Sequence, residues 1–190
     1  IILSVFFLSL IFTTFKSFTS NSGGGAGYSN APSESNCTSC HSGASLNRGK
    51  FISNLNLTSN FTGNGYIPDS TYTISVSFNQ SGISKFGFQT TVLDKATNSP
   101  IGTLSSTGSR TQKRTKVYSG KTREYIEHSS SGTSQTSTNA IVWTFDWTAP
   151  ATNAGDVNFY VVLNATNSSN SDQGDTIYAK TFTIAPSSLL

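Results

Sequence analysis

A stretch of alternating apolar and polar residues, Ala140-Ile141-Val142-Trp143-Thr144-Phe145-Asp146-Trp147, decides the fold class. Its largest side chains fall at every second position, which places them on one face of an extended strand. Pro150 follows closely and ends the strand, because proline has no amide hydrogen to give to a sheet. The pattern predicts a β-strand with one buried face.

The same two-residue period returns in three other segments, Thr71–Phe78, Asp156–Ala165 and Thr176–Ile184. Each carries its apolar residues on one face or on both, as strands of a packed sheet do. Weaker strand candidates are Lys50–Leu57, Phe86–Leu93, Ile101–Ser105, Lys113–Tyr118 and Glu124–His128.

Short turns rich in Gly, Asn and Ser separate these seven to nine strands, for example Gly63-Asn64-Gly65. No amphipathic helix lies between the strands, so nothing indicates the crossovers that a parallel sheet needs. The sequence therefore predicts an all-β protein, an antiparallel immunoglobulin-like β-sandwich.

The order of composition along the chain suggests four parts. Residues 1–20 contain an apolar run that resembles the core of a secretory signal peptide without its charged start. Residues 21–49 form an irregular segment, residues 50–186 the sandwich, and residues 187–190 a tail that leads to a C-terminal segment beyond Leu190. We expect a single exported domain with a core of its own.

Both cysteines of the chain and one of its two histidines fall in Cys37-Thr38-Ser39-Cys40-His41. C-x-x-C-H is the attachment signature of a c-type haem, in which Cys37 and Cys40 form thioethers with the haem and His41 becomes the proximal iron ligand. The two residues between the cysteines let the chain turn, so that both sulfurs face the porphyrin edge.

Other chemistries remain open for this motif. Cys37 and Cys40 can form a local disulfide or a free dithiol, with His41 incidental. A zinc site needs four ligands, which would take every cysteine and histidine of the chain. A thioredoxin-like pair would need a βαβ context, which is absent from the pattern.

The second histidine, His128, is the candidate for the distal iron ligand. The chain contains no methionine, so the common His/Met pair is excluded. A bis-His iron would have a lower reduction potential than a His/Met iron, because a thioether ligand raises the potential. Water at the sixth position would instead allow ligand sensing or peroxidase-like chemistry.

The remaining polar residues define no further site. A basic run, Arg110, Lys113, Arg114, Lys116, Lys121 and Arg123, is best interpreted as a solvated hairpin rather than as a docking site for an anionic partner. The net charge of +3, without a nucleic-acid-binding module, argues against a nucleic-acid partner.

The aromatic residues Trp143, Phe145, Trp147, Phe159 and Tyr160 are expected to pack in the core.

The order of several short blocks resembles a known family. The blocks are Cys37-Thr38-Ser39-Cys40-His41-Ser42-Gly43, Gly65-Tyr66-Ile67-Pro68, Phe86-Gly87-Phe88-Gln89, Tyr125 to His128, Trp143 to Pro150, Gly155 to Tyr160 and Gly174 to Tyr178. From about Gly24 to Ile184 the chain resembles the reeler-like, "choice-of-anchor V" domains of secreted bacterial proteins that carry one C-x-x-C-H.

The resemblance implies an immunoglobulin-like sandwich at the cell surface, and a histidine at the place of His128. Together with the residues, it leads us to expect a secreted, cell-surface or periplasmic monohaem c-type cytochrome domain with one covalent haem c. Such a domain would transfer electrons to a redox partner or a neighbouring haem protein and would not be an enzyme. We expect its attachment to the outer surface or to secretion machinery through a further C-terminal segment.

Two alternative functions remain open. One is a non-enzymatic adhesion or ligand-binding sandwich with a Cys37–Cys40 disulfide, and the other is a haem sensor or peroxidase-like protein with an open sixth site.

Overall fold

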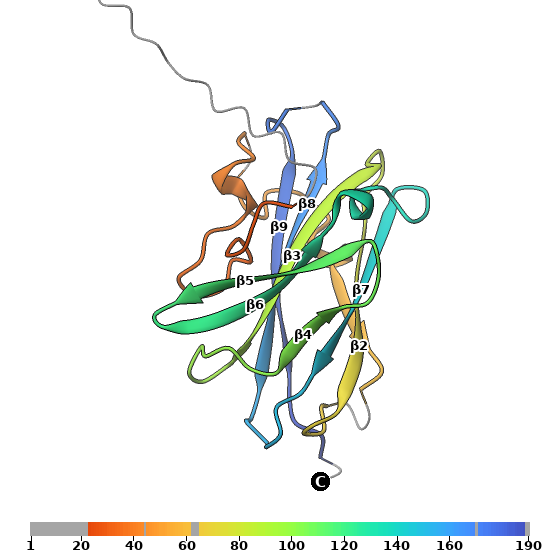
Figure 1. The fold of residues 1–190 in the computed structure, drawn as a ribbon. Coiled ribbons are helices and arrows are strands. Elements are labelled where there is room, and N and C mark those ends of the chain that lie inside the picture. Colours follow the sequence, from red (N-terminus) through yellow and green to blue (C-terminus); the bar gives the residue numbers. More distant parts are fainter. Residues whose placement is uncertain (1–22, 44, 62–64, 170, 189–190) are drawn as a thin grey trace, which may run out of the picture.

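Nine antiparallel strands and three short 3-10 turns make up the computed structural model, which describes residues 23–43, 45–61, 65–169 and 171–188 (Figure 1). The described residues contain no α-helix, and none of their helices has the length and apolarity needed to cross a membrane. The strands are β1 (Asn56–Ser59), β2 (Thr71–Asn79), β3 (Lys85–Asp94), β4 (Thr103–Ser106), β5 (Thr111–Tyr118), β6 (Lys121–His128), β7 (Ala140–Thr148), β8 (Val157–Thr166) and β9 (Thr176–Ile184). The turns are η1 (Cys37–Ser39), η2 (Ile52–Asn54) and η3 (Ser130–Thr133).

The strands form two sheets that face each other, which confirms the predicted antiparallel β-sandwich. One sheet has the order β1-β2-β7-β4 and the other the order β5-β6-β3-β8-β9. In the larger sheet, β3 pairs with β8 and β8 with β9 over nearly the whole length of these strands. The centre of the larger sheet is therefore a continuous antiparallel ladder.

Aromatic side chains from both sheets fill the space between them. Trp143 and Trp147 of β7 are fully buried, and Phe88 of β3 stacks on Trp143 with ring centroids 4.3 Å apart. Phe145 and Phe159 are also fully buried, so four of the five aromatic residues expected in the core lie there. Tyr160 is only half-buried, because it follows Phe159 on β8 and alternation turns it to the outer face.

The strand predictions hold best where the alternation is strongest. The segment predicted from Thr176 to Ile184 is β9 with the same bounds. The other strong segments differ by one residue, at one end for β2 and β7 and at both ends for β8. The candidate Lys50–Leu57 is wrong over most of its length, because η2 occupies its middle and β1 begins only at Asn56. Ile52 and Leu55 both face the core from this turn.

The part of the chain that carries the cysteines, residues 23–43, lies against the outer face of the larger sheet and is drawn in orange in Figure 1. We call it the N-terminal segment. It contains η1 and takes part in two isolated bridges, Ser29 with Asn36 and Ser42 with Gln173, and is otherwise irregular. The predicted leader, residues 1–20, lies outside the described residues.

Candidate functional site

The residues Cys37 to His41 form a single tight turn. The side chain of Asn36 accepts a hydrogen bond of 2.9 Å from the Thr38 amide and begins η1. The amides of Cys40 and His41 both donate to the carbonyl of Cys37, at 3.3 and 2.9 Å. The two cysteines and His41 are therefore held in one compact unit, as the C-x-x-C-H spacing predicts.

Both cysteines are free thiols, and their surroundings differ. Cys40 is exposed, whereas Cys37 is half-buried as a residue. Burial, together with the charges of Cys40, Glu127 and Asp175, raises the pKa of the Cys37 thiol to about 12. Cys37 is therefore a neutral thiol that faces the sheet, while Cys40 faces solvent.

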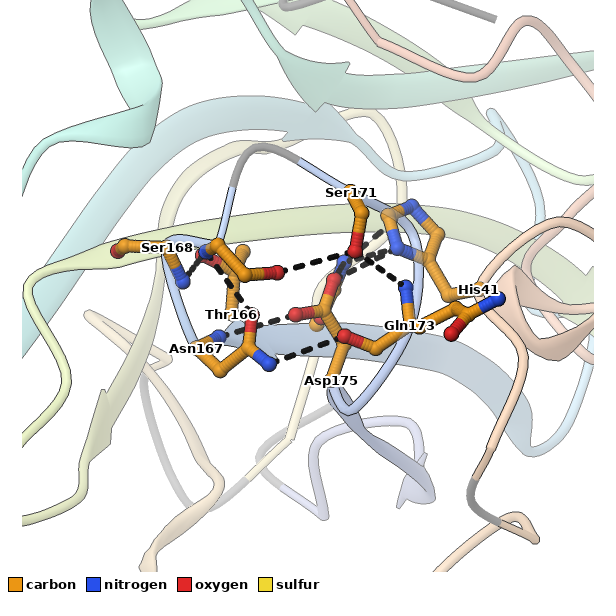
Figure 2. A network of polar contacts seen from close by, with 9 residues as sticks. His41, Thr166, Asn167, Ser168, Ser171, Gln173 and Asp175 are labelled. Atoms are coloured by element: carbon orange, nitrogen blue, oxygen red, sulfur yellow. Dashed lines mark hydrogen bonds and ion pairs between the residues drawn. The ribbon is translucent and has the colours of Figure 1, made fainter. Parts of the chain in front are cut away.

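The imidazole of His41 is held by a buried carboxylate (Figure 2). Its Nδ1 lies 2.7 Å from Oδ2 of Asp175, whose side chain is 2% exposed, while the side chain of His41 is 34% exposed. The amide nitrogen of Asn164, on β8, lies 3.2 Å from the same carboxylate oxygen and 3.1 Å from His41 Nδ1. When Nδ1 carries the hydrogen and donates it to Asp175, the lone pair of His41 is on Nε2.

Asp175 is ionised in this arrangement. Burial alone would raise the pKa of Asp175, but hydrogen bonds from His41, the Asn167 amide and the Asn164 side chain outweigh it and hold that pKa below its ordinary value of 3.8. The second carboxylate oxygen, Oδ1, accepts from the Asn167 amide at 2.9 Å. The negative charge of Asp175 is thus fixed beside His41.

His128, the second predicted ligand, lies at the end of β6 and faces the backbone of β3. Its Nδ1 is 3.0 Å from the Phe88 nitrogen and 3.1 Å from the Phe88 oxygen. The pairing of β3 with β6 covers Gln89–Glu127 and Thr90–Ile126 and stops before His128. The imidazole therefore bonds the Phe88 backbone where the next backbone hydrogen bond between the two strands would otherwise form. Nδ1 of His128 accepts from the Phe88 amide in one tautomer and donates to the Phe88 carbonyl in the other, and the second leaves Nε2 free to bind a metal.

A glycine makes room for the His128 ring. A Cβ atom added to Gly87 would lie 2.9 Å from Cε1 of His128, closer than real Cβ contacts. Gly87 pairs with Asn164 across β3 and β8, and Asn164 contacts His41. Gly87 and Asn164 therefore link the two histidines across the outer face of the sheet.

The structure brings the predicted site residues to one region. Through Gly87 and Asn164 the two histidines lie near each other. Burial is the largest influence on the His128 imidazole and lowers its pKa. His128 is therefore a neutral imidazole near neutral pH, the form that binds a metal ion.

This region supplies two free thiols and two imidazoles, the donors that a covalent haem with two histidine ligands would need. Among the described residues no group of three or more His, Cys, Asp or Glu side chains could hold a metal ion, which disfavours the zinc alternative. A haem brings four nitrogen ligands of its own, so two imidazoles are sufficient. Two surface cavities, of about 140 and 390 Å³, are lined by residues other than Cys37, His41 and His128. The case for a haem at this turn therefore rests on the donor residues and not on a cavity.

The N-terminal segment is fixed to the sheet by buried polar contacts. The side chain of Gln89 accepts from the amides of Gly27 and Tyr28 and donates to the carbonyl of Gly25. Glu34, whose side chain is fully buried, pairs with Arg123 at 2.6 Å and accepts from Tyr125 at the same distance.

This contact corrects the interpretation of the basic run as a wholly solvated hairpin. β5 and β6 do form a hairpin, and most of its cations are exposed. Arg123 is only 6% exposed, because its guanidinium binds Glu34 and the carbonyl of Pro32 beneath the N-terminal segment.

Sequence reasoning did not identify Asp175, Asn164 or Gly87. Gly87 stands between Phe86 and Phe88 in a strand pattern, and a glycine in a strand is a signal for a close approach of another group. The other two are polar residues without a periodic signal, and only the pairing of β8 with β9 shows that they meet.

Comparisons with known proteins show the fold alone. No family model and no curated protein matches the sequence. The Reelin-N domain of F-spondin is similar in structure, with a TM-score of 0.51 and 16% identity over 79% of this chain and 94% of that chain. The human F-spondin reeler domain (fragment 1) has a TM-score of 0.49 and 15% identity over 75% and 94% of the two chains. AvmM, a protein that catalyses macrocyclization in alchivemycin A biosynthesis, has a TM-score of 0.39 and 9% identity over 76% of this chain and 94% of that chain.

The F-spondin Reelin-N domain therefore supports a reeler-like β-sandwich fold for this chain. The match with AvmM is too distant to carry an argument about catalysis.

Proposed function

We propose that the chain is an extracytoplasmic monohaem c-type cytochrome domain that transfers single electrons. Cys37 and Cys40 would hold one covalent haem c through thioethers, His41 would be the proximal ligand and His128 the distal ligand. The observation that carries the proposal is the pair of imidazoles on one face of the sheet. Nδ1 of His41 lies within hydrogen-bonding distance of Asp175, and Nδ1 of His128 within that distance of the Phe88 carbonyl. The turn with the free thiols of Cys37 and Cys40 includes His41.

The exposure of the motif favours electron transfer over a closed active site. Cys40 is exposed, and the side chain of His41 is one-third exposed. A cofactor attached at this turn would have an edge near the surface, where a redox partner or a neighbouring haem protein can approach. When bound, the haem supplies a one-electron couple, and the residues of this chain orient it and set its ligands.

Haem attachment is tested by producing the exported chain in cells that have a cytochrome c maturation system. We expect a coloured protein, a pyridine haemochrome spectrum typical of two thioether bonds, and a mass increased by one haem. The Cys37→Ser/Cys40→Ser double variant is the matched control and should be colourless. A colourless protein of unmodified mass would overturn the proposal and favour an adhesion or ligand-binding sandwich.

The distal ligand is tested by the optical spectrum of the His128→Ala variant. Loss of the low-spin spectrum is expected, because the iron would lose its sixth ligand. An unchanged low-spin spectrum would remove His128 from the site. A wild-type protein that is already high-spin would favour the sensor or peroxidase-like alternative with an open sixth position.

A further inference from the structure

Of the two imidazoles, only that of His41 has a hydrogen bond to a buried carboxylate among the described residues. Asp175 is 3% exposed as a residue, and its Oδ2 lies 2.7 Å from Nδ1 of His41. His128 has no such partner at Nδ1, which meets the amide and carbonyl of Phe88 instead. The two predicted ligands therefore differ in the group that is hydrogen-bonded to Nδ1, which is charged for His41 and uncharged for His128.

The surrounding residues hold Asp175 in place. Its Oδ1 accepts from the Asn167 amide and its Oδ2 from the Asn164 side chain, so both oxygens are engaged. The loop that follows β8 is held against the cysteine motif, because Ser42 pairs with Gln173 in an isolated bridge and its carbonyl accepts from the Gly174 amide at 3.2 Å. The Asp175 carboxylate and the His41 ring are thus fixed to one another from both sides.

A carboxylate at this position changes a ligand in two ways. Its hydrogen bond to Nδ1 fixes the tautomer and the orientation of the imidazole and makes Nε2 a stronger donor. Its negative charge, in surroundings from which water is largely excluded, favours the more positive state of a neighbouring metal. The carbonyl of Phe88 can fix the tautomer and orientation of the His128 ring in the same way, but it carries no net charge.

We propose that Asp175 is a positioning residue that acts through His41 to lower the reduction potential of the iron. The inference rests on the proposed function, since it concerns the same iron. When bound, the haem would supply a one-electron couple, in which an electron from a reduced partner protein would convert ferric to ferrous iron with no bond formed or broken. The negative charge of Asp175 would stabilise the ferric state more than the ferrous state.

The test compares Asp175→Asn with Asp156→Asn in the haem-loaded protein. Asp175→Asn keeps the shape of the side chain and an oxygen for Nδ1 but removes the charge. Asp156 is a half-exposed carboxylate that precedes β8 at the opposite end from Asn164, so its variant changes net charge equally. We expect the electron-transfer equilibrium with a mediator of known potential to shift at least tenfold toward reduced protein in Asp175→Asn, about 59 mV for one electron. We expect little shift in Asp156→Asn.

A second measurement needs no haem. Nitrogen NMR of the haem-free chain should show His41 with its hydrogen on Nδ1, and Asp175→Ala should reduce the share of this tautomer. A wild-type His41 with its hydrogen on Nε2 would overturn the positioning role.

Haem-loaded proteins with equal potentials in the wild type, Asp175→Asn and Asp156→Asn would overturn the effect on potential. A wild type that never takes up haem would instead overturn the proposed function, and the NMR result would still decide the positioning role.

Discussion

Gly87 is the residue that gives the second imidazole its place. The ring of His128 lies where a Cβ atom at position 87 would stand, and the backbone φ of Gly87 is not positive. An alanine would therefore cause no backbone strain, and its methyl group would only collide with the ring.

We expect Gly87→Ala to displace His128 and to weaken or abolish the low-spin spectrum of the haem-loaded protein. Overpacking of this size costs typically about 1–3 kcal/mol of unfolding free energy. Gly108→Ala is the control, because nothing lies within 4 Å of an added Cβ there and its φ is not positive. A Gly87→Ala protein with the spectrum of the wild type would show that the ring does not need this space.

The two thiols of the haem-free chain should differ in reactivity. With a pKa of about 12, only about one Cys37 thiol in ten thousand is ionised at pH 8, and the thiolate is the form that alkylates. We expect Cys37 in a Cys40→Ser variant to react with iodoacetamide at least tenfold more slowly than Cys40 in a Cys37→Ser variant, as followed by mass spectrometry. Equal rates are expected in guanidinium chloride, and equal rates in the folded protein would contradict the burial of Cys37.

At the scale of elements, the N-terminal segment depends on one buried ion pair. Glu34 and Arg123 are both almost fully buried and hydrogen-bonded. Removing one partner of such a pair costs about 3–5 kcal/mol, because the other charge is left buried and unpaired. The chain itself therefore supplies contacts that order this segment.

We expect Glu34→Gln to loosen the segment from the sheet. Hydrogen exchange of the Tyr28 and Asn30 amides, which donate to Gln89 and Ser35, should accelerate at least tenfold. Asp156→Asn, which breaks an exposed ion pair with Lys95, should leave those amides unchanged. Unchanged exchange in Glu34→Gln would show that Glu34 does not hold the segment.

The same contact predicts a loss of stability at alkaline pH. Burial and the hydrogen bond to Glu34 raise the pKa of Tyr125 above its ordinary value of 10.0. Its folded pKa is thus higher than its unfolded one, so this stabilisation is complete below pH 10 and is lost as the pH rises above 10. We expect urea midpoints between pH 9 and 11 to fall less steeply in Tyr125→Phe than in the wild type. An equal slope in both proteins would exclude Tyr125 as the group responsible.

At the scale of the whole molecule, the sandwich depends on the aromatic core between the sheets. The indole nitrogen of Trp143 donates to the carbonyl of Gly132 at 2.8 Å, and its ring stacks on Phe88. Trp143→Phe should lower the free energy of unfolding by about 1–3 kcal/mol, through the lost hydrogen bond and the smaller ring. Val142→Ala, at an exposed position of the same strand, should change it by less than about 0.5 kcal/mol in urea unfolding.

The sequence predicts this sandwich well because its strands carry their own signal. Trp143, Phe145 and Trp147 show the two-residue period without any knowledge of their partners. Asp175 carries no such signal, since a lone Asp after Gly174 in a polar loop looks like any turn residue. Its meeting with His41 depends on strand register and on the path of the N-terminal segment, which are set by contacts between distant parts of the chain.

The hydrogen bond between His41 and Asp175 joins residues 134 positions apart. The Cys37–His41 turn leaves the ribosome before β9 is synthesised. An enzyme that attached a cofactor to Cys37 and Cys40 before the chain had folded would therefore meet His41 without its carboxylate and without His128. The final iron environment would then be completed by folding, when the last hairpin, β8 and β9, closes on a turn that is already loaded.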